Sequence, residues 1–291
     1  MNLENKYEVT PVKRKQEFQE ALAKIKQDFV PEGCRDAHPL FIIAGGQPGS
    51  GKTALVETIK SHHQNANFLV IDLDSYRSYH PDFEDIKKNH KKDGVLLTNS
   101  FAFAIEDEMI AYAEANSLNT INVSTLRNTD LELKLASKVI NLGFDLKVYV
   151  IAVSPEESYF SALKRYQEQQ KDQQCVTRFT SRRFHDISYE SLNNTVRSFI
   201  ELNIPIVVCK RAVEKDKPAQ IVYDEERNIK SVNEISPIYV INQVRKNTRR
   251  FAISTIAKQD LDMSNEIMEI QEEYKAFKKE MDEEFYRGER E

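Results

Sequence analysis

The sequence predicts an α/β protein of three layers, in which helices cover both faces of a mainly parallel β-sheet. Short apolar runs alternate with helical stretches between residues 40 and 154, as in consecutive β-α-β units. A glycine-rich loop directly follows the first apolar run and opens the first helical stretch. The chain of 291 residues, with 40% hydrophobic side chains, is long enough for one large domain with an appendage or for two small domains.

The elements are expected in the following order. Phe18, Leu22, Ile25 and Phe29 fall on one helical face, which predicts a helix in the N-terminal segment, residues 1–39. Strands are then expected at four apolar runs, which read LFIIAG (40–45), NFLVIDLD (67–74), TINVST (120–125) and LKVYVIAV (146–153). A further strand is expected at NIPIVVCK (203–210), and the apolar ends of AQIVYDEERNIKSV (219–232) predict a hairpin.

The C-terminal part is predicted to be helical. Residues 242–257 carry four basic side chains, which favours a solvated helix face; these are Arg245, Lys246, Arg249 and Arg250. Beyond residue 258 the chain is mostly charged, but an apolar stripe recurs at 3-4-3-4 spacing, at Ile267, Ile270, Tyr274, Phe277 and Met281. We expect a charged C-terminal helix over residues 258–291, which packs either back on the domain or on a partner chain.

The composition limits the function. The net charge is −5 and charged residues make up 30% of the chain, which argues against broad nucleic-acid binding. The N-terminus resembles no secretory signal and no apolar run has the length of a membrane span, so a cytoplasmic protein is expected, with no membrane partner. Cys34, Cys175 and Cys209 lie far apart without metal-ligand spacing, which indicates buried or incidental thiols.

The glycine-rich loop carries the strongest functional signal. Its eight residues fit the P-loop pattern and are Gly46, Gln47, Pro48, Gly49, Ser50, Gly51, Lys52 and Thr53. In such a loop, backbone N–H groups and a helix N-terminus converge on a phosphate. We expect Lys52 to reach the terminal phosphates of ATP or GTP and the Thr53 hydroxyl to ligate Mg²⁺. The domain over residues 40–257 is therefore predicted to have a P-loop kinase-like fold.

Two carboxylates follow the second predicted strand. Because ligands of open α/β sheets bind beyond the carboxyl ends of the strands, Asp72 and Asp74 are expected near the triphosphate. Strand alternation would send both to the same side. Asp74 is the preferred candidate for a base that accepts the proton of an attacking hydroxyl. The alternative is that one or both cap the following helix.

Arginines after the fourth strand are candidates for the phosphate clamp. Arg165 lies in the helical stretch 156–170, and CVTRFTSRRF carries Arg178, Arg182 and Arg183. Arginines on a lid can neutralise the charge that spreads over a transferring phosphoryl group. Composition alone leaves a plain surface role open.

Four stretches together resemble the zeta toxin family, bacterial kinases of toxin–antitoxin systems. These stretches span about residues 40–186 and read GGQPGSGKT, VIDLDSYRSYHPDF, GFDLKVYVIAV and KRY…TRFTSRRFHD. The resemblance implies phosphorylation of the 3′-hydroxyl of the amino sugar of UDP-N-acetylglucosamine with ATP and Mg²⁺. It also implies an antitoxin as a possible protein partner.

By position, the resemblance assigns roles to individual residues. Lys52 takes the phosphate contacts and Thr53 the metal, Asp74 matches the catalytic base, and Arg165 and Arg178 match the phosphate-clamping arginines. On the substrate side, the resemblance implies contacts from Glu106, Asn122, Ser124 and Arg127.

The third strand departs from the family pattern, in which it ends in Glu-Gly-Thr-Gly-Arg. Here Asn122 replaces the acid, the glycines are absent and one residue is inserted before Arg127. Asn supplies neither the charge nor the proton acceptor of a carboxylate, so we expect a less negative floor at this site. Three functions stay open: a nucleotide-sugar kinase, a kinase of another small hydroxyl compound, and a degenerate member that binds nucleotide without turnover.

Overall fold

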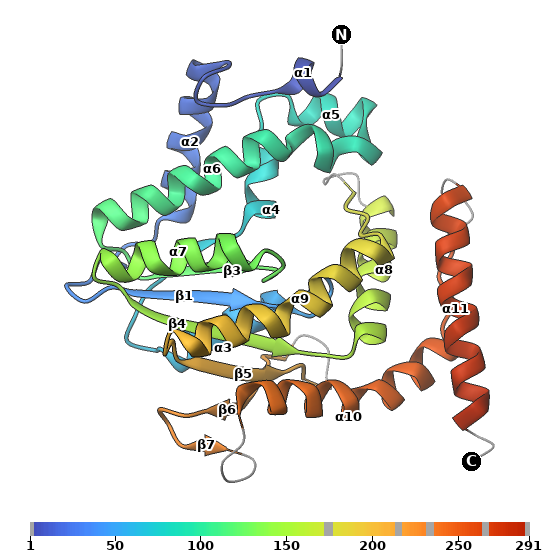
Figure 1. The fold of residues 1–291 in the computed structure, drawn as a ribbon. Coiled ribbons are helices and arrows are strands. Elements are labelled where there is room, and N and C mark those ends of the chain that lie inside the picture. The colour runs from blue at the N-terminus through green and yellow to red at the C-terminus, as the bar shows by residue number, and fades with distance from the viewer. Residues whose placement is uncertain (1–2, 172–176, 213–216, 231–235, 264–267, 289–291) are drawn as a thin grey trace.

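The computed structural model describes residues 3–171, 177–212, 217–230, 236–263 and 268–288. It confirms the predicted three-layer α/β fold (Figure 1). The strands are β1 (Leu40–Gly45), β2 (Leu69–Ile71), β3 (Thr120–Ser124), β4 (Asp145–Ala152), β5 (Ile206–Lys210), β6 (Gln220–Asp224) and β7 (Ile229–Lys230). The longer helices are α2 (Lys15–Phe29), α3 (Lys52–His62), α6 (Gly94–Asn116), α7 (Thr129–Asn141), α8 (Pro155–Lys171), α9 (Arg182–Glu201), α10 (Pro237–Ala257) and α11 (Met268–Gly288). Short helical turns complete the chain at α1 (Leu3–Tyr7), α4 (Leu73–Tyr76), η1 (Arg77–Tyr79), α5 (Phe83–Asn89) and η2 (Lys91–Asp93).

Within the described ranges, one sheet of seven strands has the order β2-β3-β1-β4-β5-β6-β7. The first five strands are parallel, and β6 and β7 form the predicted hairpin, which extends the sheet antiparallel to β5. Because β1 is paired on both sides, the loop that follows it leaves the sheet from an interior strand. Ligands of such sheets bind at this carboxyl edge.

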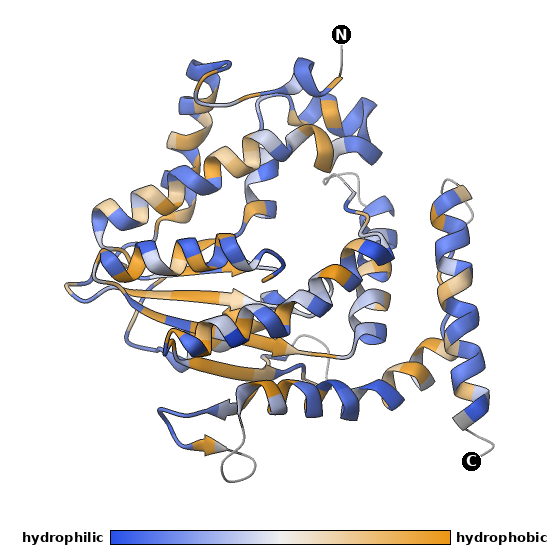
Figure 2. Cartoon of the chain, viewed as in Figure 1, coloured by the Kyte–Doolittle hydropathy of each residue, from blue (hydrophilic) through white to orange (hydrophobic). Residues whose placement is uncertain are grey.

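Helices cover both faces of the sheet. Ile43 of β1 packs on one face with Val139 of α7 and Phe199 of α9, while Ile42 packs on the other with Ile59 of α3. The central strands β1, β4 and β5 are mostly apolar, whereas the outer helices alternate between apolar and polar turns (Figure 2). This pattern is expected for a sheet that is buried on both faces.

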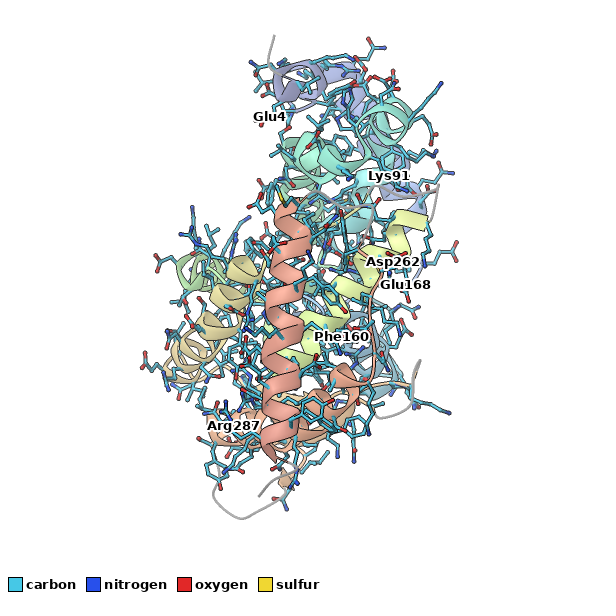
Figure 3. All side chains as sticks on the ribbon, turned by 90° about the vertical axis from the view of Figure 1, so that its right-hand side faces the viewer. Glu4, Lys91, Phe160, Glu168, Asp262 and Arg287 are labelled. Carbon is cyan, nitrogen blue, oxygen red and sulfur yellow. The ribbon has the colours of Figure 1, made fainter. Side chains whose placement is uncertain are left out.

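The N-terminal helix and the C-terminal helix both pack on this core. Phe18, Leu22 and Ile25 of α2 are buried against α6, as the helical face predicted. The apolar stripe of α11 is buried against α8 and α10, including Phe277 and Met281 (Figures 1 and 3). Packing on the chain itself is thus the alternative that the structure confirms; of the predicted stripe, Ile267 lies outside the described residues.

Two local predictions were wrong. The second strand ends at Ile71, because Asp72 begins a helical turn, so Asp72 and Asp74 do not alternate along a strand. On α10, Arg245 is buried instead of solvated, with its guanidinium 3.9 Å from the centroid of the Tyr189 ring. The stacked ring and two hydrogen bonds compensate this buried charge.

Two further observations concern the limits set by composition. The thiols of Cys34 and Cys209 are buried, and Cys175 lies outside the described residues. Among the helices of the described ranges, none is both long and apolar enough to cross a membrane.

Candidate active site

The P-loop connects the end of β1 to the first turn of α3. Gly49 and Gly51 adopt positive φ angles of 76° and 98°, a region that favours glycine. A Cβ on Gly49 would lie 2.0 Å from the carbonyl oxygen of Ser158 on α8. The loop therefore needs glycine both for its backbone curl and for its close contact with α8.

Gln47 and Ser158 link the loop to the helices behind it. Nε2 of the buried Gln47 donates to the Val153 carbonyl at 3.1 Å and to Oγ of Ser158 at 3.2 Å. The same Ser158 hydroxyl lies 2.8 Å from Nε2 of the buried His185 on α9. These contacts fix the position of the loop relative to α8 and α9.

Lys52 lies folded over the loop. Its Nζ donates to the carbonyl oxygens of Gly46 at 2.8 Å and Gln47 at 3.3 Å. Burial and the neighbouring guanidinium groups of Arg178 and Arg165 lower the pKa of Lys52 to about 7. A strongly anionic ligand at the loop would raise the pKa of Lys52 towards its usual value. Thr53 follows in the first turn of α3 with an exposed side chain.

Asp72 and Asp74 lie where β2 gives way to α4. The side chain of Asp72 accepts from the backbone N–H of Asp74 at 3.2 Å and so caps α4, the role considered for it as an alternative. Burial raises the pKa of Asp72, while the cations of Arg178 and Lys52 oppose that rise. The Asp72 carboxylate is thus close enough to Lys52 for the two charges to interact.

Arg178 connects Asp74 with the cations beside the P-loop. Oδ2 of Asp74 forms an ion pair with Nη1 of Arg178, and Oδ1 accepts from Nε of Arg77 at 3.0 Å. Arg165 and Arg178 both lie close enough to Lys52 to lower its pKa. Nε and Nη2 of Arg165 are buried without a hydrogen-bond partner among the described residues. The site therefore concentrates positive charge beside two carboxylates. Asp74 contacts Arg178, and Asp72 lies within electrostatic reach of Arg178, Lys52 and Arg165.

Arg77 was not recognised from the sequence, although it belongs to the quoted stretch VIDLDSYRSYHPDF. Its buried guanidinium donates through Nη1 to the Val95 carbonyl at 3.0 Å and to Oγ1 of Thr98 at 2.9 Å. Burial lowers its pKa to about 10. Its spacing of three residues from Asp74 on a helical turn is the signal that would have found it.

The end of β3 faces the layer of α6 and α7. Asn122 is in register with Ile43 of β1 and Ile71 of β2, which pack under these two helices. Neighbours in register point to the same face, so Asn122 and, two residues on, Ser124 do so as well. Asn122 is 95% buried, and its Oδ1 has no hydrogen-bond partner in the described part of the chain. The Ser124 carbonyl accepts from the N–H of Gly46 at 3.2 Å, which places this strand end at the mouth of the P-loop.

Glu132 on α7 adds a carboxylate that the sequence did not predict. Its Oε1 accepts a hydrogen bond from Oγ of Ser124, and its Oε2 is buried and unpartnered within the described ranges. Burial raises its pKa. Burial also raises the pKa of Glu106 on α6 to about 7, with further contributions from the charges of Asp107, Glu132 and Asp72. The carboxyl groups of Asp72 at the start of α4 and Glu132 on α7 thus both raise the pKa of Glu106 on α6.

Arg127 takes a different position from the other predicted substrate residues. Its guanidinium lies 4.1 Å from the centroid of the Phe184 ring on α9. Together with Ile187 it lines a small hollow of about 480 Å³ at the start of α7, which also includes Asn128, Thr129 and Asp130. The structure therefore does not bring Arg127 into the group around Asp74.

The P-loop follows an interior strand of a mainly parallel sheet, and a carboxylate, Asp72, follows β2 in the same sheet. These two features define a P-loop kinase-like protein. Comparisons with known proteins extend this assignment. The family model described as zeta toxin matches residues 20–228, and the chain belongs to the zeta toxin family.

Individual relatives agree with this family assignment. Toxin PezT of Streptococcus pneumoniae serotype 4 is 30% identical over 219 residues, which cover 75% of this chain and 85% of PezT. Toxin zeta of Enterococcus hirae is 32% identical over 175 residues, which cover 60% of this chain and 61% of that toxin. A solved structure from the PezAT chromosomal toxin–antitoxin system of Streptococcus pneumoniae matches with a TM-score of 0.69 at 27% identity, over 87% of this chain and 98% of that chain.

Proposed function

We propose that this protein is an ATP-dependent phosphotransferase that phosphorylates a hydroxyl of a nucleotide sugar, with UDP-N-acetylglucosamine as the first candidate. The observation that carries the proposal is the contact of Asp74 with Arg178 beside Lys52. It places a carboxylate, which can take a proton, next to cations that can hold the group to be transferred.

In the proposed reaction, the oxygen of the acceptor hydroxyl attacks the γ-phosphorus and the bond to the β,γ-bridging oxygen breaks. Asp74 accepts the hydroxyl proton, and ADP leaves with the bridging oxygen. Lys52, Arg165 and Arg178 stabilise the charge on the phosphoryl oxygens. Because Arg178 already contacts Asp74, this arginine would move from the carboxylate to the phosphate when ATP binds.

The residues present fit a Mg²⁺ ion. This cation keeps several waters and is usually bound by nucleotide phosphates with one or two protein oxygens. The Thr53 hydroxyl at the start of α3 and the Asp72 carboxylate at the end of β2 are suitable donors of this kind. No group of three or more His, Cys, Asp or Glu side chains that could hold a metal ion occurs among the described residues. When bound, Mg²⁺ would neutralise charge on the phosphate oxygens.

On the acceptor side, we propose that Glu106, Asn122 and Ser124 line the sugar. Glu106, whose pKa of about 7 leaves it partly protonated at neutral pH, can both donate to and accept from a sugar hydroxyl. Arg127 and its hollow on α7 are suited to a more distant part of the acceptor, where a guanidinium can pair with a diphosphate.

Incubation of the protein with γ-labelled ATP, Mg²⁺ and a panel of UDP-sugars tests the proposal. Label transfer to UDP-N-acetylglucosamine is expected, and Lys52→Ala should abolish it. Transfer only to a different small hydroxyl compound would support the second kinase function. Nucleotide binding without any transfer would support a degenerate, non-catalytic member.

The family membership motivates a second test in cells. We propose that expression of the wild-type chain impairs bacterial growth and that an antitoxin neutralises it, since the PezAT structure comes from such a system. Arg178→Ala should relieve the growth defect. Equal harm from wild type and from a Lys52→Ala/Arg178→Ala double variant would point to a cause other than catalysis.

A further inference from the structure

One carboxylate on the C-terminal helix joins the two elements that carry the arginines. Oε1 of Glu273 on α11 accepts a hydrogen bond from the Tyr159 hydroxyl at 2.5 Å and another from the backbone N–H of Arg182 at 2.5 Å. Tyr159 belongs to α8, which also carries Arg165. Arg182 is the first residue of α9 and follows Arg178 by four residues.

The contact with Arg182 provides an acceptor for a backbone N–H in the first turn of α9. The first N–H groups of a helix have no partner within it. Ser181 caps α9 by accepting from the N–H of Phe184 at 3.3 Å, and Glu273 accepts from the N–H of Arg182. A negative charge at this position is also favourable with respect to the helix dipole. Glu273 therefore supplies, from 91 residues along the chain, a second acceptor at the start of α9, for an N–H that Ser181 does not satisfy.

The contact with Tyr159 fixes α8 to the same oxygen. Burial and the hydrogen bond to Glu273 raise the pKa of Tyr159, so its hydroxyl stays protonated and donates. The Tyr159 ring packs edge-on against Phe277 of α11, with 4.9 Å between centroids. Figure 3 shows α11 running beside α8 near Phe160.

The segment that carries Arg178 is held at both ends. At its start, the N–H of Arg178 donates to Oε1 of Gln169 on α8 at 3.0 Å. The ring of Phe179 then packs against Tyr166, also on α8, with 5.3 Å between centroids. At its end is the N–H of Arg182, held by Glu273. Just before Arg178, the Thr177 hydroxyl also donates to the Lys91 carbonyl of η2 at 3.2 Å. Because the other anchors belong to α8 and α11, the position of the Arg178 backbone depends on how these two helices are joined.

The position of α11 has support of its own. Glu280 pairs with Arg182 at 2.6 Å, and Glu284 pairs with Arg249 of α10 at 2.8 Å. Arg249 also pairs with Glu156 at the start of α8 at 2.6 Å. Loss of the Glu273 carboxylate alone would thus leave α11 in place and remove only the shared oxygen.

We propose that Glu273 is a positioning residue, through which α11 holds Arg165 and Arg178 at the separation needed to bind the terminal phosphates of a nucleoside triphosphate. The inference rests on the proposed phosphotransferase function. It assigns a role in that function to α11, which lies beyond the segment matched by the family model.

Three variants of the full chain test this role. Glu273→Ala removes both accepted hydrogen bonds and should weaken ATP binding about tenfold, as measured by titration calorimetry. Glu273→Gln keeps an oxygen at the same place and should stay within about twofold of wild type. The control is Glu272→Ala, which removes a carboxylate that is 65% exposed and paired only with Lys275 among the contacts described, and it should leave ATP affinity unchanged.

A double variant separates positioning from general stability. If Glu273 acts through the arginine segment, Glu273→Ala should weaken ATP binding in wild type but add little in an Arg178→Ala background. A merely structural role would lower the melting temperature equally in both backgrounds and leave ATP affinity unchanged. Should Glu273→Ala fail to fold, Tyr159→Phe removes one of the two donors and should weaken ATP binding by a smaller factor.

The outcomes are distinguishable from a failure of the proposed function. Absence of ATP binding and phosphoryl transfer in the wild type would overturn the function itself. Normal wild-type activity with equal ATP affinity in Glu273→Ala, Tyr159→Phe and Glu272→Ala would overturn the positioning role alone.

Discussion

Nε of Arg77 donates a hydrogen bond to Oδ1 of Asp74 across 3.0 Å, and the arginine is the more deeply buried of the two. The guanidinium is fixed in turn by the Val95 carbonyl and by Thr98, both on α6. The orientation of the Asp74 carboxylate is therefore set by the helix that also carries Glu106. This relationship ties the proposed base to the acceptor side of the site.

Replacement of Arg77 should disturb catalysis more than nucleotide binding. In Arg77→Ala the Asp74 carboxylate loses one of its two cationic partners, so we expect kcat to fall about tenfold or more while ATP affinity changes little. The free energy of unfolding should also fall by about 1–3 kcal/mol, because buried acceptors lose their donor. The exposed neighbour Ser78 offers a control in Ser78→Ala. An unchanged kcat in Arg77→Ala would contradict this role.

Asp74→Asn should remove phosphoryl transfer and leave ATP affinity nearly intact. The amide keeps the size of the side chain but cannot take the acceptor proton, and a general base typically contributes ~10²–10⁴-fold in rate. Single-turnover transfer of labelled phosphate, next to ATP titrations, measures both quantities. Asp72→Asn is the matched comparison, since Asp72 caps α4. An inactive Asp72→Asn beside an active Asp74→Asn would reverse the assignment.

Binding of ATP should be coupled to uptake of a proton by Lys52. The pKa of about 7 in the free protein leaves this lysine mostly neutral at pH 8, and a bound polyanion raises its pKa again. ATP affinity should therefore fall as the pH rises above about 7, and binding at pH 8 should take up close to one proton. Calorimetry in buffers of different ionisation enthalpy measures this uptake. Flat affinity between pH 7 and pH 9, or uptake that persists in Lys52→Ala, would contradict it.

The protonation of Glu106 should appear in the pH dependence of stability. Its folded-state pKa of about 7 lies above the ordinary glutamate value of 4.5, so the folded protein binds more protons between these two values. The free energy of unfolding contributed by this group is therefore highest below pH 4.5 and is lost as the pH rises through 7. Glu106→Gln should be more stable than wild type at pH 8 and similar to it near pH 4.5, in thermal melts. A difference that is the same at both pH values would exclude this explanation.

Glu132 should compensate for the amide at Asn122. Because its carboxylate is bound to Ser124 on the same strand end, we expect the site to be more negative than the third strand alone suggests. Glu132→Gln should raise the KM for the sugar acceptor by a larger factor than the KM for ATP. Ser137→Ala, at an exposed position of the same helix, is the control. Asn122→Glu should then add little activity on UDP-N-acetylglucosamine, and a large gain would show that Glu132 does not substitute for the missing acid.

The sequence was most informative where chemistry depends on consecutive residues. The P-loop could be recognised because its glycines, Lys52 and Thr53 must follow one another. Asp74 was chosen because it lies just after a strand, and its role as the base stays a prediction. The second strand was predicted too long because Leu73 continues the apolar pattern past Asp72. The pattern does not show that Asp72 caps a helical turn there. Capping by Asp72 was one of the alternatives that the sequence left open, and the structure shows it at the start of α4.

Residues that act through tertiary contacts could not be predicted. Glu132 reaches Ser124 only because α7 turns back over the end of β3, and Glu273 meets α8 and α9 from a distant part of the chain. The sequence predicts a basic residue on a helix to be solvated, because it does not show whether an aromatic ring packs over the residue. Arg245 was therefore predicted to be exposed, although it packs against Tyr189. Such contacts depend on how helices pack together. The periodicity of the sequence shows only which face of a helix is buried, not what it packs against.

The short outer strands of the sheet have a consequence for self-association. In the described part of the chain, β2 and β7 occupy the two edges of the sheet and contain three and two residues. Exposed strand edges are templates for pairing with other chains, and short strands offer few free N–H and C=O groups for it. A register irregularity between Val208 and Cys209 further interrupts the regular ladder next to the hairpin. The long apolar strands that would aggregate most readily lie inside the sheet, so a high local concentration of the folded protein should not lead to edge-to-edge β-pairing.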